Sequence, residues 1–185
     1  MTMNAFTPEQ QREILQFVRE VIRAKLTRTP SPSLPGLDSL DLLGSCFVTL
    51  HTDSGELRGC IGNITPVESL GDNLRSNALN AAFRDPRFPP VASTEELAQL
   101  VVEISVLTPM KEIADLKEFE IGRHGIVMNL HGRSAVFLPQ VAPEQGWDKE
   151  TTLDYLSLKA GLPKDAWRSS ATRFMTFEAI VFGEE

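Results

Sequence analysis

The sequence predicts an α+β fold in which antiparallel sheets are covered by packed helices. β-rich runs and amphipathic helical stretches follow one another in mixed order, without the regular alternation of a doubly wound parallel sheet. Two pairs of β-rich runs are each joined by a short turn-forming segment, which is typical of hairpins and hence of antiparallel pairing. The 185 residues, of which 42% are hydrophobic, suffice for a substantial core. We therefore expect one domain over residues 1–185, with two lobes at most and no separable linker.

The first expected element is a helix from Pro8 to about Lys25. Thr7 can cap this helix, proline suits the first helical position, and Gln10 completes a capping box. Its apolar residues keep helical spacing and form one stripe for the core: Ile14, Leu15, Val18, Val21, Ile22 and Leu26. Residues 29–36 contain three prolines and predict a stiff surface connector.

A hairpin should follow, with β-rich runs at 46–51 and 57–61 around the turn-forming residues 52–55. If His51 pairs with Glu56, every second residue shares a face. The face expected to join the core carries Cys46, Val48, Leu50, Leu57, Gly59 and Ile61. The face expected to carry a site has Phe47, Thr49, His51, Arg58 and Cys60.

Arg58 and Cys60 are the first candidate pair for chemistry. Two residues apart on one strand, their Cβ atoms would lie roughly 6 to 7 Å apart, and a guanidinium at that range favours the reactive thiolate. Gly59 and Gly62 flank the cysteine, and a strand glycine often marks a bulge or the close approach of a backbone or ligand. The alternative is that Cys60 is a small buried hydrophobe and that Arg58 serves a surface ion pair.

The next helix should begin at a capping box in 65–68 and end near Arg84, because Asp85 precedes a proline. Its end would deliver Arg84, Asp85 and Arg87 to the edge of the Cys60 site. The proline loop has two interpretations, an ion pair that stabilises the loop or a clamp for an anion. A guanidinium fork binds carboxylate or phosphate with two parallel hydrogen bonds.

Further elements complete the sheets. Ser93 should cap a short helix through about Gln99, and 100–107 should form an interior strand. Within that strand Glu103 needs a partner, for which Arg58 is a candidate. The later elements expected are a hairpin of 126–130 and 134–138 around His131, Gly132 and Arg133, a helix over 149–160 capped by Asp148, and one strand over 172–182.

Composition narrows the function. A net charge of −7 opposes broad nucleic-acid binding, which needs a basic footprint. We expect no membrane span and no secretory signal. Because the chain has only two cysteines and no export signal, we also expect a cytoplasmic location and no disulfide framework. We expect no metal site, since the three histidines and two cysteines are dispersed, although His51, Cys60 and Glu103 could converge.

The hexapeptide LRGCIG at 57–62 resembles the defining motif of the AMMECR family. Other blocks resemble the family in the same order: 77–78, 81–83, 85–90, 103–107, Gly122, 124–125, 138–139 and 146–148. The resemblance implies a larger lobe from both chain ends, a smaller lobe from the middle and a cleft near LRGCIG, and it singles out His124. It also implies kinship with the A component of a three-part set that includes a Memo-like protein and a radical-SAM protein.

Two functions are favoured, and sequence-specific nucleic-acid binding is a third possibility that the acidic balance opposes. In one, Cys60 is a catalytic nucleophile or thiolate ligand supported by Arg58. In the other, the chain is a non-catalytic adaptor that binds a small anionic ligand or a partner, such as the Memo-like and radical-SAM proteins. The candidate ligand-binding residues are Thr49, His51, Arg58, Gly59, Cys60, Arg84, Asp85, Arg87, Glu103 and His124. The residues indicate no particular cofactor.

Overall fold

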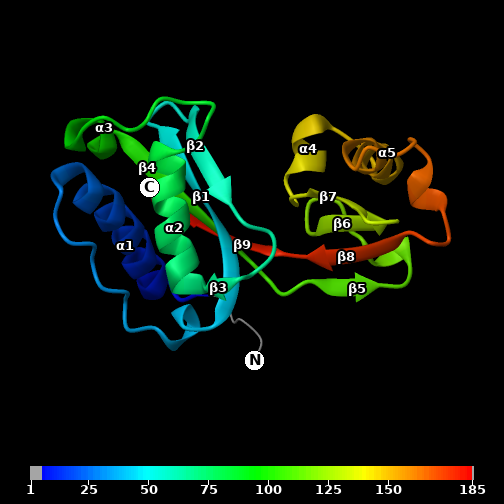
Figure 1. Cartoon of the computed structure of the whole chain (residues 1–185), viewed down its shortest axis with the longest axis horizontal. Coiled ribbons are helices and arrows are strands. Elements are labelled where there is room, and N and C mark those ends of the chain that lie inside the picture. The colour runs from blue at the N-terminus through cyan, green and yellow to red at the C-terminus, as the bar shows by residue number, and fades with distance from the viewer. Residues whose placement is uncertain (1–5, 185) are drawn as a thin grey trace. The chain divides into compact units, whose positions relative to one another are not determined.

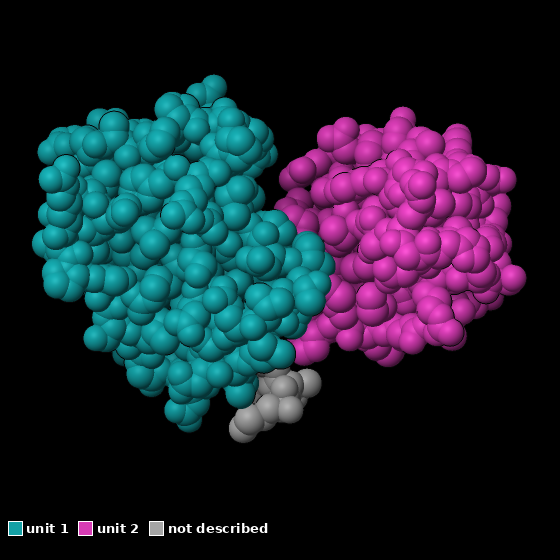
Figure 2. All heavy atoms as spheres, in the orientation of Figure 1, with its two compact units in different colours: residues 1–107, 180–185 teal, residues 108–179 magenta. Residues whose placement is uncertain are grey.

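The computed structural model of the protein describes residues 6–184, which form two compact units (Figures 1 and 2). One unit combines the chain up to Leu107 with the segment from Ile180, and the other comprises Thr108–Ala179. The larger unit is therefore built from both chain ends, as the resemblance implies. Residues 6–184 contain α-helices and two antiparallel sheets, and the predicted α+β fold is confirmed.

The first unit contains a sheet in the order β2-β1-β4-β9, with β3 paired to β1. Its strands are β1 (Leu43–Thr52), β2 (Leu57–Gly62), β3 (Glu68–Ser69), β4 (Leu100–Leu107) and β9 (Ala179–Gly183). Its helices are α1 (Pro8–Thr27), a 3₁₀ turn at Asp38–Leu40, α2 (Leu70–Phe83) and α3 (Thr94–Ala98). The interior position predicted for the 100–107 strand is confirmed, because β4 lies between β1 and β9.

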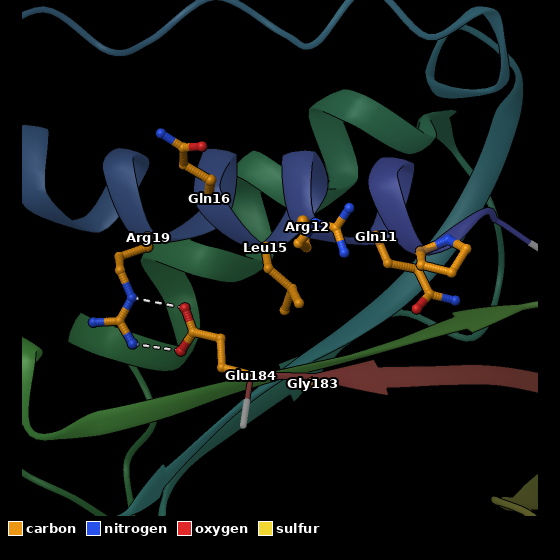
Figure 3. Close-up of a pocket in the computed structure, with 8 residues that line it drawn as sticks. Gln11, Arg12, Leu15, Gln16, Arg19, Gly183 and Glu184 are labelled. Carbon is orange, nitrogen blue, oxygen red and sulfur yellow. Dashed lines mark hydrogen bonds and ion pairs between the residues drawn. The ribbon is translucent and has the colours of Figure 1, made fainter.

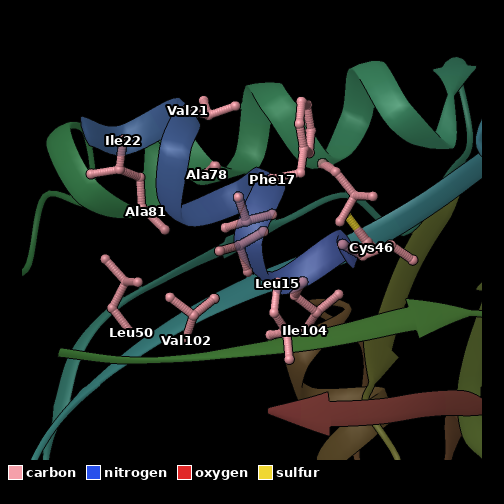
Figure 4. Packing of buried hydrophobic residues seen from close by; sticks show 14 of the residues in the cluster. Leu15, Phe17, Val21, Ile22, Cys46, Leu50, Ala78, Ala81, Val102 and Ile104 are labelled. Atoms are coloured by element: carbon pink, nitrogen blue, oxygen red, sulfur yellow. The ribbon is translucent and has the colours of Figure 1, made fainter. Parts of the chain in front are cut away.

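The core of this unit lies between one face of the sheet and helices α1 and α2 (Figure 4). The predicted capping box of Thr7 and Gln10 begins α1, whose apolar stripe is buried. Cys46, Val48 and Leu50 of β1 are fully buried against these helices, together with Val102 and Ile104 of β4. The face predicted for the core is buried at these β1 residues and at Gly59, but the prediction is wrong for Leu57, which is 39% exposed.

The register predicted for the first hairpin, with His51 opposite Glu56, is wrong. The observed partners are Phe47 and Gly62, Val48 and Ile61, Thr49 and Cys60, Leu50 and Gly59, and His51 and Leu57. The ladder is irregular between Leu50 and His51, and Arg58 is the extra residue of the resulting bulge. From Phe47 to Leu50 the partners are shifted by two residues from the predicted ones, so Thr49 and Cys60 keep their predicted face. Leu57, now opposite His51, does not keep its predicted core face.

Helix α2 begins later than its predicted start at residues 65–68. Ser69 is the actual cap, and its hydroxyl accepts a hydrogen bond from the backbone N–H of Asp72. Glu68 and Ser69 cannot join the helix because they form β3, paired with Leu43 and Gly44 of β1. The predicted end of the helix is close to the observed one, with Arg84 as the C-cap.

The second unit has a sheet in the order β5-β8-β6-β7. Its strands are β5 (Lys111–Ile113), β6 (Gly125–Leu130), β7 (Arg133–Phe137) and β8 (Arg173–Phe177), and its helices are α4 (Val141–Gln145) and α5 (Lys149–Lys159), with 3₁₀ turns at Leu116–Glu118 and Ala166–Arg168. The hairpin of β6 and β7 is as predicted, but its loop is the two-residue type, with His131 and Gly132 both at positive φ. The Asp148 cap of α5 is confirmed.

The single strand predicted over residues 172–182 is wrong, because the segment is divided between two sheets. β8 pairs with β5 and β6, whereas β9 pairs with β4. Glu178 marks the break: its backbone N–H donates to the Thr108 hydroxyl, and its carbonyl accepts from the Thr108 N–H. The chain thus leaves one ladder and enters the other at this residue pair.

Candidate functional site

The candidate site lies on the face of the first sheet opposite helices α1 and α2. Cys60, Thr49 and Glu103 form one row across β2, β1 and β4. The Thr49 hydroxyl donates a hydrogen bond to the Cys60 Sγ at 3.3 Å, which orients the sulfur. Cys60 is partly exposed, whereas Cys46 is fully buried on the core side, and this burial raises the pKa of the Cys46 thiol to about 12. Only Cys60 of the two is placed to meet a ligand.

The loop after α2 fastens both backbone groups of Cys60. The buried Asp85 carboxylate accepts the Cys60 N–H at 2.9 Å, and Arg87 Nη2 donates to the Cys60 carbonyl at 3.1 Å. Arg87 also holds Asp85 through Nε at 2.9 Å and Nη2 at 2.7 Å. Because β2 is an edge strand, these side chains supply partners that a further strand would otherwise provide.

The charges in this loop support one another. The hydrogen bonds from Arg87 hold the pKa of the Asp85 carboxyl well below its usual range, even though burial acts in the opposite direction. Asp85 in turn raises the pKa of the Arg87 guanidinium, and the nearby Cys60 adds to this effect. The Arg87 side chain is nevertheless 53% exposed. A fixed, ionised guanidinium is therefore presented to solvent beside the Cys60 residue.

Arg58 has a different neighbour from the one that its sequence position suggested. Its Nε and Nη2 donate to Glu96 Oε1 of α3 at 3.0 and 2.7 Å. The predicted pairing of Arg58 with Glu103 is wrong, since Glu103 Oε1 instead lies 4.0 Å from His51 Nε2. The bulge explains the change, because it interrupts the strict alternation that would have kept Arg58 beside Cys60.

The motif glycines allow close packing within the protein itself. A Cβ on Gly59 would lie 2.3 Å from the Ala81 carbonyl oxygen of α2, so only glycine lets β2 approach this helix. A Cβ on Gly62 would lie 2.3 Å from Cγ of the Phe47 ring. Of the possibilities raised by the sequence, two are found at Gly59: it adjoins the bulge at Arg58, and the backbone of α2 approaches it closely.

Two predicted ligand-binding residues, Arg84 and His124, have neighbours other than Cys60 and Arg87. Arg84 is exposed and lines a hollow with Lys25 and α2. His124 belongs to the second unit, where its Nδ1 accepts the Glu120 N–H at 3.1 Å and its Nε2 lies 3.5 Å from Glu178 Oε1. These contacts account for its position in the turn before β6.

A buried asparagine network behind the hairpin was missed by sequence reasoning. Asn73 Oδ1 accepts the Cys46 N–H at 2.9 Å, and Asn77 Nδ2 donates to the Cys46 carbonyl at 3.1 Å. Both amides also reach Asn63, directly after the motif. The available signal was two asparagines four residues apart in an apolar helix, where buried amides need partners. The network fixes β1 and the end of β2 against α2.

A metal centre and a hollow beside α1 are the other possible sites. Within residues 6–184, no group of three or more His, Cys, Asp or Glu side chains is placed to hold a metal ion, so the possible convergence of His51, Cys60 and Glu103 does not give one. A hollow of about 600 Å³ lies between α1 and the end of β9 (Figure 3). Its main feature is the ion pair of Arg19 with Glu184, and none of the predicted site residues lines it. No described helix is long and apolar enough to cross a membrane.

Comparison with known proteins identifies the class to which this fold and motif belong. The AMMECR1 family model matches residues 15–182, and the chain belongs to this family. Protein MK0488 of Methanopyrus kandleri is 46% identical over 146 residues, covering 75% of this chain and 70% of that protein. A protein of Methanosarcina acetivorans is 39% identical over 191 residues, covering 97% and 94%.

A solved structure has the same fold. The crystal structure of the uncharacterized protein PH0010 from Pyrococcus horikoshii matches with a TM-score of 0.83 and 35% sequence identity. The match covers 97% of this chain and 94% of that one, so it includes both units.

Proposed function

We propose that this AMMECR-family protein is a binding protein whose ligand-binding surface surrounds Cys60 and Arg87 on the first sheet. The ligand is a small anion or a segment of a partner protein that presents a carboxylate or phosphate. The guanidinium binds that group, and the thiol with the Thr49 hydroxyl contacts the neighbouring part of the ligand. His51 and Glu103 extend the polar surface along the same face.

The observation that carries this proposal is the fixation of Arg87. Its Nε and Nη2 are held by Asp85 and the Cys60 carbonyl, yet about half of the side chain remains exposed. A guanidinium already fixed in place loses little rotamer freedom when it binds an anion. A surface arginine without such contacts would lack this advantage.

We also propose partners, a domain extent and a cellular location for the protein. We propose a Memo-like protein and a radical-SAM protein as partners, and the resemblance in the motif supports them. We also propose that both units form a single AMMECR domain over residues 1–185, because the family model spans the two. A cytoplasmic location is supported by the two unlinked cysteines.

Catalysis by Cys60 is the second candidate. It is favoured by the partly exposed sulfur, the hydroxyl at 3.3 Å and the guanidinium of the same residue cluster. In this version Arg87 takes the supporting role that the sequence suggested for Arg58. A nucleophilic thiol would form a covalent adduct with an electrophilic substrate.

Affinity capture tests the proposed partners. The tagged chain is co-expressed with the Memo-like and radical-SAM proteins of its own genome. We expect recovery of at least one partner by the unaltered chain, loss of recovery with R87E, and retention with R12E, which introduces the same charge change on α1. Failure to recover either partner, or equal recovery by R87E, would contradict the proposed interface.

A further inference from the structure

A second hollow in the first unit combines cationic and apolar side chains. It has a volume of about 230 Å³ and lies between the last turn of α1 and the C-terminal half of α2, two helices that pack side by side (Figure 1). Its lining residues are Lys25, Ser76, Leu79, Asn80, Phe83 and Arg84. The α2 residues are spaced three and four apart and so form one stripe along the edge of the core, against which Leu79 and Phe83 partly pack.

The polar side chains of this hollow form no hydrogen bond or ion pair with the residues that the structure describes. Among residues 6–184, each of the other five lysines has a hydrogen bond or an ion pair, and only Lys25 has neither. Most of the arginines have such a bond, but the Arg84 guanidinium has none to a residue within 6–184. In the same part of the chain, the side chains of Ser76 and Asn80 also form no hydrogen bond.

The electrostatic setting selects the sign of a ligand. The protein carries a net charge of −7, yet the described residues that line this hollow include two cations and no carboxylate. Two positive groups converging on a partly enclosed space attract an anion more strongly than isolated surface cations do. Both cations lie at helix C-termini, Lys25 in the last turn of α1 and Arg84 after the last turn of α2, where the negative end of each helix dipole stabilises the cation and partly offsets its attraction for an anion.

The apolar residues define the rest of the ligand. Leu79 and Phe83 contribute one aliphatic and one aromatic side chain, while Ser76 and Asn80 can donate hydrogen bonds. Sites for small molecules commonly combine an apolar surface with a few polar groups that orient the ligand. We propose that this hollow binds a small organic anion, namely a carboxylate or a phosphate monoester joined to a flat apolar group.

Protein-observed NMR with phenyl phosphate and phenylacetate tests this assignment and separates the two anion classes. At least one probe should shift the amides around Lys25 and along 76–84 in a saturable manner, while the neutral analogue benzyl alcohol and inorganic phosphate bind more weakly. R84Q should weaken binding about fivefold, the size expected for one partly exposed charge contact. R12Q removes the same charge elsewhere on the surface and should change the affinity less than twofold. A twofold change corresponds to about half the free energy of a typical exposed ion pair.

Two results would overturn the proposal. One is the absence of saturable shifts in this segment with both probes. The other is equal weakening by R84Q and R12Q, which would indicate a general effect of net charge. Because both arginine side chains lie at the surface, neither substitution should impair folding.

Discussion

The variant G59A is expected to lose about 3 kcal/mol of unfolding free energy, the upper end of the usual cost of overpacking. The added methyl group would lie 2.3 Å from the Ala81 carbonyl oxygen, which is backbone and cannot rotate away. β2 would have to move off α2, and the bonds that fasten Cys60 would lengthen. Urea unfolding followed by circular dichroism measures the loss.

A matched glycine variant controls for the change in backbone entropy. A Cβ on Gly36 would have no other atom within 4 Å, so G36A should alter stability by less than about 0.5 kcal/mol, as is usual for surface substitutions. Equal stability of G59A and G36A would show that β2 and α2 are not in close contact at this point.

The variant D85N is expected to lose about 2 kcal/mol at pH 7, in the range for hydrogen bonds to a buried charged group that are no longer made. The amide keeps the shape of the carboxylate but replaces one acceptor oxygen with a donor, which would face either the Cys60 N–H or Arg87. D41N, which changes an exposed carboxylate, should have little effect.

The pH dependence of this loss in unfolding free energy tests whether the ionised Asp85 carboxylate causes it. Because the pKa of this carboxyl is lower in the folded than in the unfolded protein, its stabilising contribution is complete above the unfolded pKa of about 3.9 and is lost as the pH falls further. The difference in unfolding free energy between the unaltered protein and D85N should therefore shrink below pH about 4. A difference that stays constant down to pH 2 would mean that the charge of Asp85 contributes nothing.

Local signals in the sequence were sufficient for most elements. The Thr7 and Asp148 caps, the apolar alternation in 100–107 and the turn residues of both hairpins each depend on neighbours in the chain, and the structure agrees with them. The proximity of Asp85 and Arg87 to Cys60 was also anticipated, because a helix ending at a proline has few ways to continue.

The remaining features depend on contacts between distant segments. Gly59 is a local signal compatible with a bulge, but it does not predict that the bulge turns Arg58 toward Glu96. Only the pairing of Glu68 with Gly44 delays the start of α2. The break at Glu178 requires Thr108, which is 70 residues away. For the same reason Arg87, not Arg58, is the guanidinium fastened to Cys60.

The most direct test of the Cys60 and Arg87 site compares an anionic with a neutral thiol reagent. The rates of Cys60 modification by iodoacetate and iodoacetamide are measured by mass spectrometry in the native protein, with buried Cys46 as the internal control. We expect the ratio of the iodoacetate rate to the iodoacetamide rate to be higher for Cys60 than for a free thiol. This ratio should fall to the free-thiol value in R87Q and stay high in R58Q. A ratio that depends on Arg58 but not on Arg87, or that never exceeds the free-thiol value, would contradict the site described above.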